Sequence, residues 1–140
     1  MYIRLAYSKE SETISFAASE LKYYLSKITN SIVFVNDSTA HHPSTITLEL
    51  FPDSQKHSDT DDEYHIEISK GTGHIYGSNS RSVLLGIYKY LTLLGCRFLR
   101  PGKDYEYIPK LSSIEEFDIS CHEKAENKYR GVCIEGADCP

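Results

Sequence analysis

The chain has 140 residues, of which 40% are hydrophobic, and a formal net charge of −5, which suits a single globular fold rather than a disordered chain. Because phosphate binding needs a basic face, the acidic balance argues against a nucleic-acid partner. The opening Met1–Tyr7 does not look like a signal peptide, and no apolar run approaches the about 18 residues of a membrane span, so we expect a cytoplasmic protein with no membrane partner.

The beginning of the chain predicts a strand followed by a long amphipathic helix. Tyr2–Tyr7 alternates apolar residues on one face, which is typical of a strand. Ser11 is a suitable N-cap for a helix that begins at Glu12, and Asn30, which tolerates the left-handed conformation, is suited to end it. Apolar residues recur between these caps at helical spacing: Ile14, Ala17, Ala18, Leu21, Tyr24, Leu25 and Ile28.

The middle of the chain is predicted to be rich in strands. Four segments are β-branched or alternate apolar with polar residues: Ser31–Asn36, Thr45–Leu50, Tyr64–Ile68 and Ile75–Gly77. Between the second and the third of them, Phe51–Asp62 holds a proline and several aspartates, which indicates a solvated loop. Gly71 and Gly73 supply the positive φ angles that a tight hairpin needs between the last two strands.

A second helix is predicted to begin at Asn79 or Ser80 and to stop at Gly95. Gly86 lies inside this helix and costs it about 1 kcal/mol of propensity relative to alanine. Such a glycine indicates a close approach to the sheet or to the first helix. The expected buried stripe of the second helix is Leu84, Ile87, Tyr88, Leu91 and Leu94.

The end of the chain is predicted to be irregular before it returns to strand character. The short extended segments expected after the second helix are Cys96–Leu99, Tyr105–Ile108 and Ile114–Ile119. Ser120–Lys128 is polar and has the composition of a linker, whereas Tyr129–Gly136 again has the apolar pattern of a strand. These patterns divide the chain into a domain of residues 1–120, a linker of residues 121–128 and the start of another unit at residues 129–140. The element order predicts an α+β domain, in which two helices cover one face of a mostly antiparallel sheet.

Several motifs give this domain a resemblance to a known family. They are Ala18–Leu25 in the first helix, His74–Tyr88 across the last strand and the second helix, and the exit Leu94–Gly102 with Tyr107–Pro109. In these motifs the chain resembles the small α/β domain that precedes the catalytic barrel in family 20 glycoside hydrolases, the β-N-acetylhexosaminidase type, and in related α-glucuronidases. The resemblance implies a zincin-like fold and a non-catalytic role, with a downstream barrel of the same polypeptide as its partner.

The last segment resembles the first strand of the family's (β/α)8 barrel, and it departs from the Asp-bearing pattern of family 20. Barrel sites form at the C-terminal ends of strands, where Glu135 would lie. The resemblance implies that Glu135 and Arg130 bind substrate only within a complete barrel. No residue of the chain matches the family's catalytic Asp-Glu pair, so no catalytic residue is assigned. If Val132 and Ile134 belong to a barrel strand, their apolar edge lacks its partners here and is expected to be disordered or buried in a contact.

Two functions are therefore expected in the first instance. One is a non-catalytic accessory domain of a carbohydrate-degrading glycoside hydrolase. The other is a free-standing carbohydrate-binding module that uses a tyrosine-rich face. An independent, metal-dependent enzyme is a third and weaker hypothesis. The tyrosines that would form such a face are Tyr23, Tyr24, Tyr64, Tyr76, Tyr88, Tyr90, Tyr105 and Tyr107.

The histidines and acidic residues do not form a recognisable metal motif, and no metal or cofactor is expected. His65 and His74 would meet across the predicted hairpin, but one such pair makes only half of a zinc site. The acidic run that includes Asp62 and Glu63 lacks the spacing of a calcium loop and is interpreted as a solvated surface. The four cysteines contain no Cys-x-x-Cys pair and are expected to be free thiols: Cys96, Cys121, Cys133 and Cys139.

Overall fold

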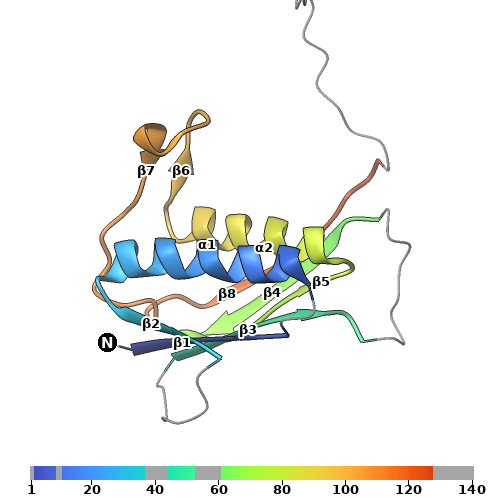
Figure 1. Ribbon diagram of the computed structural model, residues 1–140, viewed down its shortest axis with the longest axis horizontal. Helices are drawn as coiled ribbons and strands as arrows, with labels where there is room; N and C mark the ends of the chain where they lie inside the picture. Colours follow the sequence, from blue (N-terminus) through green and yellow to red (C-terminus); the bar gives the residue numbers. More distant parts are fainter. Residues whose placement is uncertain (1, 9–10, 37–43, 53–60, 128–140) are drawn as a thin grey trace, which may run out of the picture.

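The computed structural model describes residues 2–8, 11–36, 44–52 and 61–127. Its longer elements pack as two layers, with both α-helices of these residues on one face of a sheet (Figure 1). In chain order, the elements are β1 (Tyr2–Tyr7), α1 (Glu12–Thr29), β2 (Ile32–Val35), β3 (Ser44–Leu50), β4 (Glu63–Ser69), β5 (Thr72–Gly77), α2 (Ser80–Leu93), β6 (Arg97–Phe98), the 3-10 turn η2 (Lys103–Tyr105), β7 (Glu106–Tyr107) and β8 (Ile119–Lys124). Within the described residues, no helix is at once long enough and apolar enough to cross a membrane.

The main sheet is mixed, and the expectation of a mostly antiparallel sheet was wrong. Its strand order is β2-β1-β3-β5-β4-β8. Three of its five strand pairings are parallel, namely β1 with β2, β1 with β3 and β3 with β5. The reason is that α1 carries the chain from β1 to a parallel neighbour, after which β3 joins the other side of β1. The broad α+β prediction, with two helices on one face, holds.

Helix α1 forms as the sequence predicted. The Ser11 side chain accepts a hydrogen bond from the Ile14 backbone N–H, and Asn30 ends the helix in the left-handed conformation, with φ 53°. All seven residues of the predicted apolar stripe are buried. The core of the domain lies between this helix, α2 and the covered face of the sheet.

Helix α2 begins as predicted, but its buried stripe is rotated. The Asn79 side chain accepts from the Ser82 backbone N–H and caps the helix. Its apolar contacts with the core are made by Val83, Ile87, Tyr90, Leu91 and Leu94, while Leu84 and Tyr88 are only partly buried. The rotation follows from Gly86, which faces the sheet: a Cβ atom there would lie 2.9 Å from Ile75 Cγ2.

Two residues of the acidic run, Asp62 just before β4 and Glu63 at its first position, are not part of the solvated surface that the composition indicated. Asp62 is buried, and its Oδ1 accepts hydrogen bonds from Arg81 Nε at 2.9 Å and Nη2 at 2.7 Å. Glu63 is buried as well. Because Arg81 lies in the first turn of α2, the Asp62 carboxylate joins the start of β4 to the positive end of that helix.

The polar segment after residue 118 also differs from its prediction. Residues 119–124 form β8, which pairs antiparallel with β4, so residues 121–124 belong to the sheet rather than to a linker. This pairing joins residues far apart in sequence, such as His65 and His122, and local composition gives no sign of it. The segment Tyr129–Gly136, with the predicted start of a barrel, lies outside the described residues.

We expect Gly77→Ala to destabilise the domain more than Gly86→Ala. At position 77 the added Cβ would lie 2.6 Å from the Val83 backbone nitrogen and 2.8 Å from the Asn79 carbonyl oxygen, so the chain itself must shift. The expected loss in the free energy of unfolding is about 2–3 kcal/mol. At position 86 the contact is with a side chain, which can shift. Alanine there also favours the helix by about 1 kcal/mol relative to glycine. Urea unfolding followed by circular dichroism measures both changes, and equal losses would contradict the packing described here.

Candidate functional site

The most prominent surface feature is a projection formed by the segment that leaves α2. Strands β6 and β7 pair antiparallel, with Arg97 opposite Tyr107 and Phe98 opposite Glu106, and η2 lies between them. We call residues 97–107 the β6–β7 projection. It rises from the helix layer on the side opposite the sheet (Figure 1). The sequence predicted both extended segments, but nothing local indicated that they pair with each other.

The projection is rich in exposed apolar side chains. Leu99 is 75% exposed and Tyr107 is 60% exposed, and Phe98 and Tyr105 are exposed as well. These four are a large part of the exposed apolar side chains in the described chain, and all of them lie within residues 98–107. A shallow hollow of about 510 Å³ lies beside them, lined by Tyr88, Phe98, Leu99, Arg100, Pro101, Gly102 and Glu106. Several exposed apolar side chains gathered on one short segment are typical of a contact site.

Tyr24 of α1 holds the base of the projection. Its hydroxyl donates to Glu106 Oε1 at 2.9 Å, and its ring meets that of Phe98 edge-on, with 5.5 Å between centroids. Burial and the nearby Glu106 carboxylate raise the pKa of Tyr24, so the hydroxyl stays a neutral donor. One buried side chain therefore contacts both strands of the projection.

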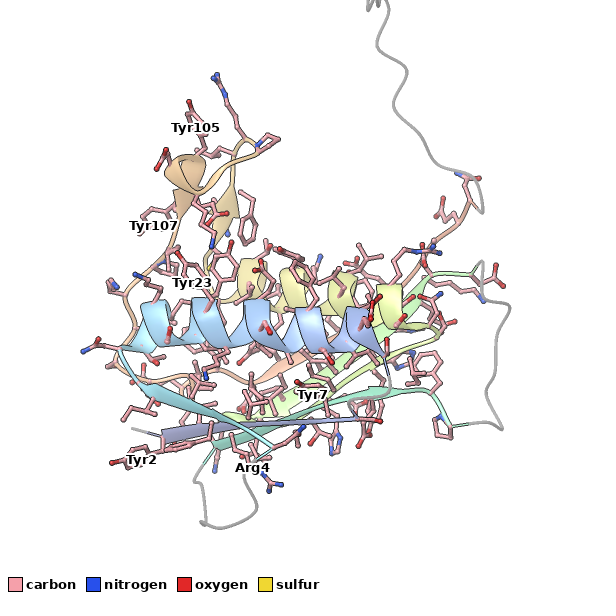
Figure 2. All side chains as sticks on the ribbon, viewed as in Figure 1. Tyr2, Arg4, Tyr7, Tyr23, Tyr105 and Tyr107 are labelled. Atoms are coloured by element: carbon pink, nitrogen blue, oxygen red, sulfur yellow. The ribbon has the colours of Figure 1, made fainter. Side chains whose placement is uncertain are left out.

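On this side of the molecule, lysine and arginine side chains lie over tyrosine rings. Tyr23, Tyr105 and Tyr107 lie on the side of the projection and of the adjacent α1 (Figure 2). Lys103 Nζ lies 4.1 Å from the centroid of the Tyr23 ring, and the Arg100 guanidinium lies 5.8 Å from that of Tyr105. Cation–π contacts of this kind fix the two rings but also occupy their faces.

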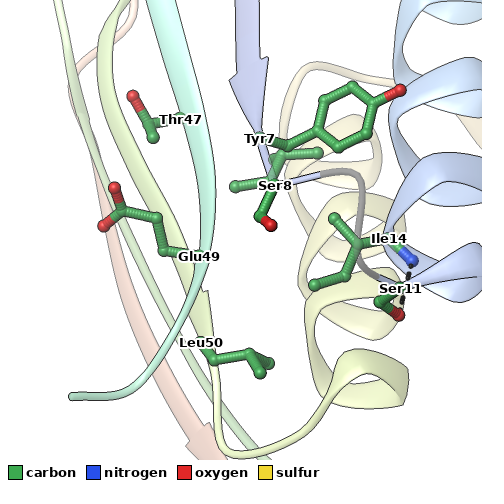
Figure 3. Close-up of a pocket in the computed structure, with 8 residues that line it drawn as sticks. Tyr7, Ser8, Ser11, Ile14, Thr47, Glu49 and Leu50 are labelled. Atoms are coloured by element: carbon green, nitrogen blue, oxygen red, sulfur yellow. Dashed lines mark hydrogen bonds between the residues drawn. The ribbon is translucent and has the colours of Figure 1, made fainter.

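A second hollow, of about 360 Å³, lies where β1 and β3 end and α1 begins (Figure 3). Its position corresponds to the carboxyl ends of two parallel strands, where α/β folds often bind ligands. Its lining is largely apolar: Tyr7, Ser8, Ser11, Ile14, Thr47, Leu48, Glu49 and Leu50. The helix end beside it is capped by the chain itself, since the Ser11 side chain accepts from the Ile14 backbone N–H.

The histidines are placed differently from the sequence-based pairing. His74 does not face His65; it lies opposite Glu67, and its Nδ1 is 3.4 Å from Glu49 Oε2. His65 instead lies between Tyr76 on β5 and His122 on β8. The ligand atoms of Glu63, His65 and His122 all lie within 4.8 Å of one another. Nothing in the sequence indicated that His122 lies beside His65, because only the β4–β8 register brings it there.

The remaining predicted site residues can be placed only in part. Glu135 and Arg130, the proposed substrate-binding residues, lie outside the described residues, as do Val132 and Ile134. Cys96 and Cys121 are free thiols, as expected, and burial raises the pKa of the Cys96 thiol to about 11. Such a thiol is a poor nucleophile at neutral pH. The other two cysteines also lie outside the described residues.

Comparison with known proteins finds a distant structural neighbour. No family model matches the chain, and no curated protein matches it. Among solved structures, the chain is similar to a GH138 enzyme targeting pectin rhamnogalacturonan II, with 18% sequence identity and a TM-score of 0.48. The match covers 67% of this chain and 13% of that chain. The chain therefore corresponds to a small part of the enzyme's length.

We expect Tyr24→Phe to loosen the β6–β7 projection. The change removes the hydrogen bond to Glu106 and leaves the ring in place, at an expected cost of about 1.5–3 kcal/mol because the acceptor is a carboxylate. Trypsin should then cleave faster after Arg97 and Lys103, as followed by mass spectrometry. The matched control is Tyr88→Phe, which removes a hydroxyl bonded to Glu20 instead. Equal acceleration in both variants would show that Tyr24 has no special role at the projection.

Proposed function

We propose that this chain is a non-catalytic accessory domain of a carbohydrate-degrading glycoside hydrolase, of the hexosaminidase N-terminal type, which packs against a downstream catalytic barrel of the same polypeptide. The support begins with the motifs that resemble that family. Residues 18–25 lie in α1, residues 74–88 run from β5 into α2, and residues 94–102 form the exit into the projection. The resembling residues therefore include the elements that build and carry the β6–β7 projection.

The single observation that carries the proposal is the exposed apolar surface of the projection. Leu99 and Tyr107 are largely exposed, although Tyr24 and Phe98 fix the strands from which they extend. A fixed segment with apolar tips is suited to insertion against another surface, because little conformational entropy is lost on docking. The last described residues after β8 also run toward the helix side of the sheet, the side on which the projection stands (Figure 1).

Hydrogen–deuterium exchange tests this docking directly. The gene is sequenced past the Pro140 codon. The full-length protein that it encodes is then expressed and compared with the 140-residue chain. We expect residues 97–107 to exchange more slowly in the longer protein, because the barrel covers them. No change in exchange there, or a stop codon directly after Pro140, would contradict the proposal.

A pair of surface variants sharpens the same test. In the longer protein, Leu99→Ser should weaken the association of the two domains and restore fast exchange in the projection. Ile32→Ser is the matched control, since Ile32 is also an exposed apolar residue but lies on β2, away from the projection. Equal effects of the two substitutions would indicate a general loss of stability rather than a docking surface.

A carbohydrate-binding module is the second candidate function, and the tyrosines beside the projection favour it. Sugar stacking needs a free aromatic face, but the faces of Tyr23 and Tyr105 contact Lys103 and Arg100. Tyr107 is the more suitable platform because it is 60% exposed. Titration of the chain with N-acetylhexosamine and glucuronic acid oligosaccharides, followed by NMR, would show shifts at Tyr107 that Tyr107→Ala abolishes. Absence of any shift in the unaltered chain would exclude this candidate.

A further inference from the structure

Three potential metal ligands meet on the face of the sheet that the helices leave uncovered. Glu63 and His65 are two residues apart on β4, and residues with this spacing point to the same face of a strand. His122 lies directly opposite His65 in the antiparallel pairing of β4 with β8. Tyr64, between the two β4 ligands, points to the other face and packs in the core.

The distances within this cluster are close to those of a metal site. His122 Nε2 lies 2.8 Å from Glu63 Oε1, and His65 Nε2 lies 3.4 Å from the same oxygen. Around a tetrahedral zinc ion with bonds of about 2 Å, ligand atoms are separated by about 3.3 Å. Both measured separations are within about half an ångström of that value, and the ligand atoms of all three residues lie within 4.8 Å of one another.

The carboxylate of the cluster is buried and the two imidazoles are partly exposed, an arrangement that suits metal binding. The Glu63 side chain is 10% exposed, whereas those of His65 and His122 are 34% and 55% exposed. The carboxylate is thus fixed beneath two imidazoles that border solvent. Three protein ligands with one side open leave a position for water or a substrate oxygen, as in catalytic zinc sites.

Neighbouring groups fix the cluster. The Glu63 backbone N–H donates to Ser78 Oγ at 3.1 Å, and its carbonyl accepts from the Ser78 backbone N–H at 2.9 Å. The Phe51 ring packs edge-on against His65, with 5.1 Å between centroids. Lys124 Nζ is 3.6 Å from Glu63 Oε2, whereas Oε1 contacts the two imidazoles. Lys124 also places a positive charge near the site, which opposes binding of a cation.

We propose that Glu63, His65 and His122 bind one Zn²⁺ ion, with water as the fourth ligand, and that the ion links β8 to β4. This proposal is independent of the proposed accessory function. The ligand set of two imidazoles and one carboxylate suits zinc better than magnesium or calcium, which prefer oxygen ligands. Because the ion would bind groups from two strands, binding stabilises their pairing.

Zinc titration of the metal-free 140-residue chain tests the site. Calorimetry should show one ion bound at this site, and the unfolding temperature should rise with zinc concentration. His65→Ala and His122→Ala should each weaken binding at least tenfold, since even the loss of a group that only supports a ligand costs about 10–100-fold. Lys124→Met should tighten binding severalfold, because it removes the nearby cation.

The matched control is His74→Ala. His74 lies on the same uncovered face and also contacts a carboxylate, Glu49, but it is not part of the cluster. Its loss should leave zinc affinity unchanged. Cobalt(II) should give the visible spectrum of a tetrahedral site with nitrogen and oxygen ligands, and a thiolate charge-transfer band would instead indicate capture of the ion by cysteines. Circular dichroism verifies that each variant is folded.

Several outcomes would overturn the proposal. They are no zinc binding by the unaltered chain, unchanged affinity in folded His65→Ala and His122→Ala, an equal loss in His74→Ala, or a cobalt spectrum dominated by thiolate ligands. In any of these cases the cluster is a set of polar contacts between Glu63 and the two imidazoles. Failure here leaves the docking proposal intact, because that test concerns residues 97–107.

Discussion

The structure depends on the packing of two helices against one face of a six-stranded sheet. The apolar stripe of α1 and the close approach of α2 at Gly86 bury nearly all the large side chains of the core on that face. The opposite face carries polar and charged residues such as Glu63 and His65 beside apolar ones such as Ile32, and the segment after α2 extends away from the helices. Both surfaces discussed above, the β6–β7 projection and the Glu63–His65–His122 cluster, are consequences of this one-sided packing.

Tyr24 connects the core to the projection. It is one of the seven buried residues of α1, yet its hydroxyl reaches Glu106 and its ring reaches Phe98. A buried tyrosine whose hydroxyl has a partner joins the apolar core to a polar surface element at low cost. The orientation of the projection is therefore determined by the core rather than by its own short strands, which share only two residue pairs.

Local signals in the sequence predicted the helices well and the sheet only in part. Ser11, Asn30 and Asn79 are caps whose effect is confined to neighbouring residues, so their positions were predicted correctly. Strand order depends on contacts between distant segments, such as β1 with β3 and β4 with β8, and composition does not encode them. For the same reason the prediction that the acidic run is solvated was wrong for Asp62. Its hydrogen-bond partner is Arg81, which lies in α2, later in the chain. His122 could not be assigned to a site until the register of β8 was known.

The position of β8 at the end of the sheet has a consequence for self-association. An outer strand offers unpaired backbone groups to any other chain with a free edge. Here that strand has the sequence Ile-Ser-Cys-His-Glu-Lys, and Glu123 and Lys124 place charges of both signs along it. Lys89 of α2 also pairs with Glu123, which holds one of these charges beside the strand. A second copy approaching this edge would have to desolvate those charges, so the β8 edge of the sheet resists pairing with another chain.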